Sequence, residues 1–232
     1  MRVSRDFVQT VVAHFHKHEL HLLSFFPVQV TKTFGELLIV PLINWILLSL
    51  LPLNLVRASS RPALSAANGQ CMVFAADNYK RHQWHKQVRV DPVEDIAIMR
   101  KMKEAGFKVE TLPGNNEISC RMYHTFRESL NGVARSAPAF FGNNWLLATF
   151  FVVLIVPGPL LVFLSRDLFL IYLFILTVLL MRVFVSMVSK QAVLLNVLLH
   201  VPQMLMLPIV VFKGLYSRFK RRYQWKGRAF KL

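Results

Sequence analysis

The sequence predicts an α/β domain followed by a transmembrane region, and two features of its 232 residues support this fold class. Hydrophobic residues make up 54% of the chain and charged residues 17%, whereas soluble domains average roughly 45–50% and about 25%. The apolar residues gather in long blocks after residue 144, while residues 57–128 alternate between short apolar runs and turns. A soluble core alone does not account for this distribution, so we expect the C-terminal blocks to lie in a bilayer.

Residues 5–23 are predicted to form an amphipathic helix, because five apolar residues recur at helical spacing: Phe7, Val8, Val11, Val12 and Phe15. His14, His18 and His21 fall on one face of this helix. Such a face either binds a metal ion or is an ordinary polar surface, and no carboxylate accompanies it in an HExxH arrangement.

Residues 37–56 form an apolar stretch of 20 residues, which is long enough to cross a membrane. Pro41 and Pro52 argue against a straight helix in this stretch, as do its polar residues. We expect a segment that lies in the membrane interface or packs beneath the soluble domain, with a true span as the alternative.

Residues 57–128 contain three predicted strands and one predicted helix. The strands are "GQCMVFA" after the turn Asn68-Gly69, "FKVETL" before a loop at 113–116, and the alternating "EISCRMY". The helix covers residues 93–105 and is closed by Gly106, a residue suited to the position after a helix end.

The segment "HTFRESLNGVARSAPAFFG" is basic and amphipathic, with Phe126, Leu130 and Val133 on one side. This pattern predicts a helix on the membrane surface. Three apolar blocks follow at 145–164, 168–188 and 192–212, each long enough to cross about 30 Å of hydrocarbon.

The distribution of basic residues predicts the number of membrane spans. The soluble part and the tail are both basic, so both are expected in the cytoplasm, whereas three full spans would separate them. The third block is also interrupted by polar residues and prolines. We therefore expect two spans and a re-entrant or interfacial third block in the cytoplasmic membrane, with the soluble part and the tail on the cytoplasmic side.

Residues 213–232 form a basic tail without an acidic residue. Because the tail directly follows apolar segments, it favours a partner in the anionic lipid bilayer over nucleic acid.

Glu94 and Asp95 stand side by side at the predicted start of a helix. Carboxylates in the first turn are favoured by the exposed N–H groups and the helix dipole, by about 0.3–1 kcal/mol each. The same pair also suits a general base that takes a proton from an attacking hydroxyl group. Residue spacing alone leaves both interpretations open.

Two further stretches have a structural and a functional interpretation. In "RRYQWKGRAF", Trp225 and Tyr223 suit a membrane-interface belt, while Lys226 and Arg228 suit stabilisation of a leaving diphosphate. In "SAANGQCMVF", the Asn68-Gly69 pair is a turn signal. Gly69 would also let backbone approach a ligand, with Asn68 and Gln70 as hydrogen-bond donors.

Taken together, these stretches resemble the membrane-bound branch of the family-2 glycosyltransferases, which includes carotenoid, hopanoid-associated and ceramide glucosyltransferases. The resemblance covers nearly the whole chain in five ordered segments: residues 21–53, "AANGQCMVFAADNY" at 66–79, "VEDIAIMRKMKEAGFKV" at 93–109, "CRMYHTFRESLNGVAR" at 120–135 and "QWKGR" at 224–228. Five matches in order are more specific than any one of them.

The resemblance implies a partial GT-A fold and an inverting hexosyl transfer from a nucleotide sugar to a lipid-like acceptor, with a divalent metal (Mn or Mg) on the diphosphate. It implies that Asp95 is the general base, with Glu94 beside it. It also implies two groups of substrate-binding residues: Asn68, Gly69 and Gln70 on the acceptor side, and Gln224, Trp225, Lys226 and Arg228 closing the donor or acceptor site.

The chain departs from the family pattern in its first half. The nucleotide-binding strands and the Asp-x-Asp metal motif are missing from the sequence, so the chain resembles the C-terminal part of such an enzyme. Four interpretations stay open: a fragment, an internal start, a degenerate remnant, or a split gene whose separately encoded N-terminal half carries the metal ligands and the donor site. The alternative is a non-catalytic membrane protein that keeps the scaffold to bind a partner or lipid.

The expected division of the chain follows from these segments. It comprises a GT-A remnant at 1–34, an apolar segment at 35–56, the acceptor-side half with its surface helix at 57–143, a transmembrane region at 144–212 and the basic tail at 213–232.

Overall fold

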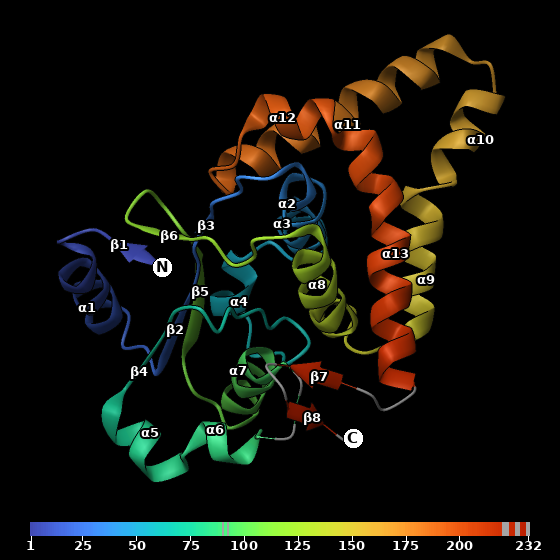
Figure 1. Cartoon of the computed structure of the whole chain (residues 1–232). Coiled ribbons are helices and arrows are strands. Elements are labelled where there is room, and N and C mark those ends of the chain that lie inside the picture. The colour runs from blue at the N-terminus through green and yellow to red at the C-terminus, as the bar shows by residue number, and fades with distance from the viewer. Residues whose placement is uncertain (90, 92, 220–222, 226–227, 231–232) are drawn as a thin grey trace. The chain divides into compact units, whose positions relative to one another are not determined.

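The computed structural model describes residues 1–89, 91, 93–219, 223–225 and 228–230, and it is a mixed α/β structure (Figure 1). The chain divides into two compact units. The first unit comprises residues 1–30 and 47–121, and the second comprises residues 31–46 and 122–232. Each unit therefore combines segments that are far apart in the sequence.

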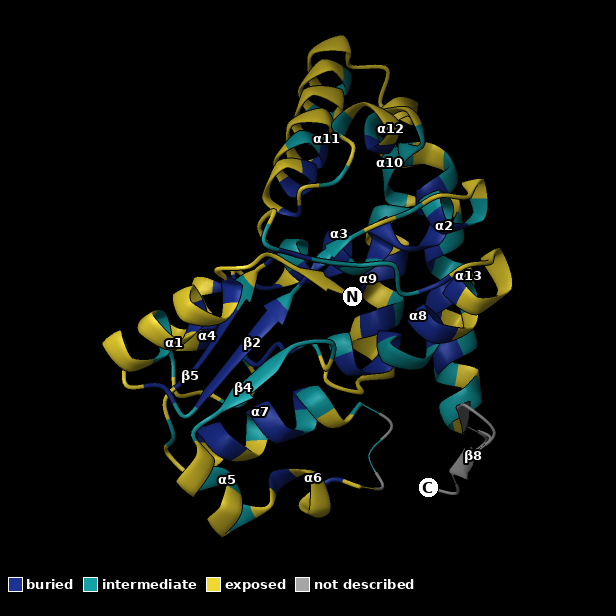
Figure 2. Cartoon of the chain, turned by 60° about the vertical axis from the view of Figure 1, so that its left-hand side comes forward, coloured by how far each residue is buried: buried dark blue, intermediate teal, exposed yellow. Residues whose placement is uncertain are grey.

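The first unit is built on a mixed three-stranded sheet. Strand β2 (Leu22–Phe26) lies between β4 (Met72–Phe74), to which it is antiparallel, and β5 (Val109–Pro113), to which it is parallel. Leu22 packs into one hydrophobic core, while Leu23 and Phe25 pack into another. Both faces of β2 are thus covered, which Figure 2 shows as a dark blue central strand.

This central strand corrects the helix predicted for residues 5–23. Helix α1 (Phe7–Lys17) ends before Glu19, whose positive φ of 50° turns the chain. The "LLSFF" run then forms β2. A strand buried on both faces has a continuous apolar run without alternation, and such a run resembles the end of an apolar helix.

Helices cover the two faces of this sheet. The core on the Leu22 side includes residues of α4 (Asn54–Ala58), α6 (Trp84–Gln87) and α7 (Glu94–Glu104), and the other core includes residues of α1. Helix α5 (Ala76–His82) joins β4 to α6. A second small sheet has the order β1 (Arg2–Val3), β6 (Ile118–Cys120), β3 (Val28–Gln29).

Several predictions for residues 57–128 are confirmed. Strands β4, β5 and β6 lie in the three predicted runs, and α7 lies within the predicted helix. Gly106 follows α7 with a φ of 78°, a left-handed conformation that glycine adopts without a Cβ penalty. The loop after β5 turns at Gly114, whose N–H donates to the carbonyl oxygen of Phe26 at 2.6 Å.

The apolar stretch at 37–56 is divided among three helices and packs inside the protein. Helix α2 (Phe34–Ile39) meets α3 (Pro41–Leu50) at Val40, and α4 follows Pro52. In the second unit, Ile39, Leu42 and Ile46 have no exposed surface. This burial agrees with the expectation of a packed segment.

Two helices among the described residues are long and apolar enough to cross a membrane: Trp145–Leu164 and Leu168–Val188, with mean hydropathies of 2.6 and 2.7. The first consists of α9 (Trp145–Ile155) and α10 (Gly158–Leu164), and the second is α11 (Leu168–Val188), as predicted. Only 17% and 11% of their apolar windows are buried. Their exposed apolar surfaces (yellow in Figure 2) favour a membrane location.

The third apolar block is divided at Leu199. It forms α12 (Val193–Leu198) and α13 (His200–Phe219), and α13 lies beside α8 (Phe126–Phe140) and α9 (Figure 1). Its buried residues, which include Met204, Leu207 and Val211, face protein.

Helix α8 buries part of the predicted apolar side together with small residues. Val133 is buried, whereas Phe126 is 41% exposed. Most of the buried residues of α8 are small: Ser129, Gly132, Ala134, Ala137 and Ala139 among them. Gly214 of α13 lies against the backbone of Ala134. A Cβ added at Gly214 would meet the carbonyl oxygen of Ala134 and would lie 3.0 Å from Cδ of Pro138. Small residues allow two helix backbones to approach closely, a packing mode common in membrane helix pairs.

This close approach predicts that Gly214→Ala destabilises the protein by about 1–3 kcal/mol, because the added methyl group meets helix backbone that must shift. Gly158→Ala is the matched control, since its added Cβ would lie 3.5 Å from the nearest atom, an ordinary contact. Thermal unfolding in detergent micelles compares the two variants. Equal melting temperatures would contradict close packing at Gly214.

Candidate functional site

The structure brings two of the predicted motifs into direct contact. The backbone N–H of Gly69 donates to Oδ2 of Asp95 at 2.6 Å, and the N–H of Ile96 donates to Oδ1 at 2.9 Å. Asp95 therefore caps the first turn of α7 and also holds the turn that precedes β4. The helix-cap interpretation and the site interpretation of this carboxylate are compatible.

The Asn68-Gly69 turn is hydrogen-bonded to the central strand β2. The hydroxyl of Ser24 on β2 accepts from the N–H of Asn68 at 2.8 Å and donates to the Asn68 carbonyl at 3.2 Å. The side-chain oxygen of Asn68 accepts from the N–H of Gln70 at 2.9 Å, and Gln29 donates to the Gln70 side chain at 3.0 Å. The predicted residues Asn68, Gly69 and Gln70 thus form one supported turn.

Ser24 was not among the residues that the sequence singled out. It has no exposed surface, and a hydroxyl group in such a place needs a hydrogen-bond partner. The signal available in the sequence was a single serine inside the apolar run "LLSFF".

The two predicted carboxylates differ in exposure. Glu94 is exposed on the first turn of α7, and Asp95 is half-buried. A half-buried carboxylate that backbone N–H groups hold in place has the chemistry required to take a proton from a hydroxyl group. Glu94 lies beside this position as the predicted neighbour.

The predicted "QWKGR" residues lie at the edge of the described chain. Strands β7 (Tyr223–Trp225) and β8 (Arg228–Phe230) form an antiparallel hairpin in which Trp225 pairs with Arg228. Lys226 and the side chains of Gln224, Trp225 and Arg228 lie outside the described residues. Their role in closing a substrate site stays a prediction.

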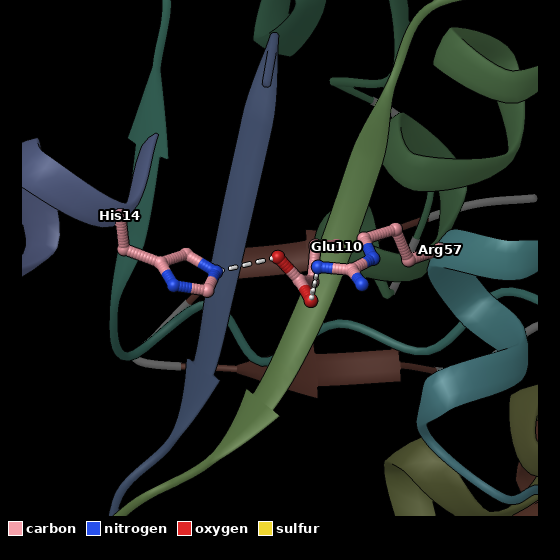
Figure 3. A network of polar contacts seen from close by, with 3 residues as sticks. All are labelled: His14, Arg57 and Glu110. Atoms are coloured by element: carbon pink, nitrogen blue, oxygen red, sulfur yellow. Dashed lines mark hydrogen bonds and ion pairs between the residues drawn. The ribbon is translucent and has the colours of Figure 1, made fainter. Parts of the chain in front are cut away.

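A second polar arrangement in the first unit was missed by sequence reasoning. Glu110 on β5 is 6% exposed, and one of its carboxylate oxygens lies 2.7 Å from Nε2 of His14 on α1. The other lies 3.1 Å from Nη1 of Arg57 on α4. Figure 3 shows the carboxylate between these two side chains, so a buried charge is paired on both sides.

The predicted histidine face does not form a metal site. His14 pairs with Glu110, and its ring lies 4.4 Å from that of His18, measured between centroids. His21 lies beyond the end of α1, with its ring 5.0 Å from that of Phe107. Across the described ranges, no three His, Cys, Asp or Glu side chains are grouped to hold a metal ion. The divalent cation that the family resemblance implies, with its ligands outside this chain, stays a prediction.

Lys103 holds the segment that leads to the Asn68 turn. Its ammonium group is buried and donates to the carbonyl oxygens of Ser59 at 2.9 Å and Leu64 at 2.6 Å. Burial lowers the pKa of Lys103 to about 8, because the charged form loses its hydration.

Comparison with known proteins gives no assignment: no family model, curated protein or solved structure matches this chain.

Pairing of Glu110 predicts that Glu110→Gln destabilises the protein by about 1–3 kcal/mol, because hydrogen bonds to a buried charge are lost. Glu19→Gln is the control, since Glu19 pairs with Lys108 on the surface, where an ion pair contributes about 0–1 kcal/mol. Denaturant unfolding measures both. Equal losses would mean that the buried network contributes no more than a surface pair.

The lowered pKa of Lys103 predicts a pH-dependent stability. Between about pH 8 and 10.5 the unfolded chain binds more protons at this group than the folded protein, so stability rises with pH. Across this pH range, the free energy of unfolding of the unchanged protein rises by roughly 3 kcal/mol relative to that of Lys103→Met. Below about pH 8 the difference between the two proteins is constant. Unfolding measured from pH 7 to 10.5 tests this, with exposed Lys101→Met as the control. A stability difference between the unchanged protein and Lys103→Met that does not change with pH would contradict the lowered pKa.

Proposed function

We propose that this chain is the acceptor-side part of a membrane-bound family-2 glycosyltransferase with a partial GT-A fold. In this proposal it takes part in hexosyl transfer from a nucleotide sugar to a lipid-like acceptor, with inversion. The observation that supports the proposal is the hydrogen bond between Gly69 and Asp95. The two stretches that the resemblance assigns to the acceptor side and to the general base lie in contact, although 26 residues separate them.

Asp95 acts as the general base in this proposal. Its carboxylate takes the proton of the acceptor hydroxyl while the hydroxyl oxygen forms a bond to the anomeric carbon. The bond from that carbon to the nucleotide diphosphate breaks on the opposite side, and the diphosphate leaves with the electron pair. General-base assistance of this kind contributes about 10²–10⁴-fold to a rate.

Gly69 lies directly beside the base in this arrangement. A Cβ added at Gly69 would lie 3.4 Å from Oδ2 of Asp95, an ordinary contact, so closeness to the carboxylate does not by itself require glycine at this position. Asn68 and Gln70, on either side of Gly69, line the acceptor side in the proposal, and Glu94 shapes the other side of Asp95.

In this proposal the nucleotide sugar and its divalent cation are bound by a donor half that lies outside these 232 residues. Across the described ranges no three His, Cys, Asp or Glu side chains are grouped to hold a metal ion, and the residues named here act on the acceptor. The two candidate membrane spans support an acceptor that reaches the site from the bilayer. A cytoplasmic position of the site and of the tail belongs to the same proposal.

The test is Asp95→Asn in the assembled enzyme, assayed in membranes with radiolabelled UDP-glucose and GDP-mannose. Asparagine keeps one of the two accepting oxygens and loses the other hydrogen bond, which costs about 1–3 kcal/mol of stability. Because it does not accept the proton, we expect a folded protein and a loss of transfer of about 10²–10⁴-fold. Asp77→Asn is the matched control, because Asp77 is an exposed acid in the first turn of α5.

Unchanged transfer in Asp95→Asn would contradict the assignment of the base. Calorimetry with the same nucleotide sugars and Mn²⁺ addresses the non-catalytic alternative. That alternative predicts no nucleotide-sugar binding even when the donor half is supplied.

A further inference from the structure

A group of polar side chains is buried among the apolar helices of the second unit. We call it the buried polar cluster and define it by Trp45, Arg182, Ser186, Asn196, His200 and Gln203. Arg182 is 1% exposed and lies on α11, a candidate membrane span. It shares the buried face of that helix with Val185 and Ser186, while most other residues of α11 are exposed and apolar.

The Arg182 guanidinium group makes two contacts with neighbouring residues. Its Nε donates to the carbonyl oxygen of Asn196 at 3.0 Å, in the last turn of α12. Its central carbon lies 4.8 Å from the centre of the Trp45 ring, a cation–π distance. Neither contact carries a negative charge, so the positive charge of Arg182 is not neutralised by them.

One terminal nitrogen of the guanidinium group has no hydrogen-bond partner. Nη2 of Arg182 is buried without a hydrogen-bond partner. In the part of the chain that the structure describes, the ion pairs involve Glu110 and Glu19, and none involves Arg182. This guanidinium group is therefore a buried cation without a carboxylate.

Other buried polar atoms near Arg182 also lack a hydrogen-bond partner. Nε1 of Trp45, a donor, is buried without a partner, and so is Nδ1 of His200, whose ring lies 5.5 Å from that of Trp45. By contrast, the side chain of Asn196 is fully engaged with Ser186, Gln191 and Gln203. The unpartnered polar atoms of the cluster are thus Nη2 of Arg182, Nε1 of Trp45, Nδ1 of His200 and the acceptor Oε1 of Gln203.

His200 adds no charge to the cluster. It lies outside the two candidate spans, and burial, with a smaller contribution from the Arg182 charge, lowers the pKa of His200 to about 4. The imidazole is therefore neutral at pH 7, and the cluster carries the single positive charge of Arg182.

A buried cation with an unpartnered donor is costly, and an ionisable residue inside a candidate membrane span is by default a candidate functional site. The planar guanidinium group matches the oxygens of a phosphate group. Arg182 stands six residues before Val188, the end of α11. At a rise of 1.5 Å per residue this is about 9 Å along the helix, a depth that an arginine side chain reaches from the headgroup region.

We propose that the buried polar cluster binds a phosphate group, with Arg182 as its charge partner and the indole N–H of Trp45 as a further donor. The phosphate belongs either to the headgroup of an anionic lipid or to a free phosphate ion. Anionic headgroups are known to occupy basic sites between transmembrane helices. This proposal does not rest on the proposed glycosyltransferase activity.

The test measures thermal unfolding of the full chain in delipidated detergent micelles. The added ligands are dioleoyl phosphatidic acid, phosphatidylcholine as the zwitterionic comparison, and inorganic phosphate. We expect phosphatidic acid, inorganic phosphate or both to raise the melting temperature in a saturable way, because a ligand that binds only the folded state stabilises it. The same titrations give an apparent Kd.

Three variants make this test specific. Arg182→Gln should weaken the apparent affinity about 10- to 100-fold, the effect of losing charge-assisted hydrogen bonds. Arg182→Lys keeps the charge but loses the fork geometry, so we expect a smaller loss. Lys190→Gln removes an exposed cation just after the same helix and should bind within twofold of the unchanged protein.

Stability without ligand separates binding from structural support. Removing an unpaired buried charge should leave the melting temperature of Arg182→Gln equal to or above that of the unchanged protein. An arginine that only supports the helices would instead lower the melting temperature equally with and without phosphate, which would overturn the proposal. Should Arg182→Gln fail to fold, Arg182→Lys gives the same comparison.

The two ligand sources are distinguished by the same titrations. A shift with phosphatidic acid alone supports a lipid headgroup, and a shift with inorganic phosphate as well supports recognition of the phosphate group itself. No shift with either ligand, or an equal shift in the Arg182 variants, would overturn the proposal.

Discussion

The proposed chemistry depends on the hydrogen bond between the Gly69 N–H and the Asp95 carboxylate. Helix α7 supplies the carboxylate, and the turn before β4 supplies the N–H group. Ser24 fixes that turn to the central strand, where it pairs in register with Met72. A slip of one residue in β2 would turn Ser24 to the opposite face of the sheet. The position of the candidate base is therefore set by strand register as well as by its own helix.

The sequence predicts this arrangement in part. Helix α7 follows from its periodicity, its acidic first turn and Gly106, and α11 follows from an apolar run with a single charge. Strand β2 does not follow, because "LLSFF" is buried on both faces and lacks the alternation that marks a strand. The pairing of His14 with Glu110 is equally invisible, since 96 residues separate the partners and only the folded sheet brings them together.

Glu110 and Arg182 are two buried charges with different surroundings. In the first unit, Glu110 is paired on both sides by His14 and Arg57. In the second unit, Arg182 has an aromatic ring and a carbonyl group as its neighbours, but no carboxylate in the described residues. In the sequence, Arg182 is a single charge in an apolar block, and its contacts with Trp45 of α3 and Asn196 of α12 exist only in the folded structure. The contrast with Glu110 is the reason to assign Arg182 a ligand and Glu110 a structural role.

The central claim is that Asp95 serves as the base in a single displacement at the anomeric carbon. The anomeric configuration of the transferred sugar tests this most directly, measured by NMR on the glycolipid that the assembled enzyme makes from an α-linked nucleotide sugar. The account predicts a β-linked product, because a hydroxyl activated by Asp95 attacks opposite the leaving diphosphate. An α-linked product, which requires retention, would contradict it.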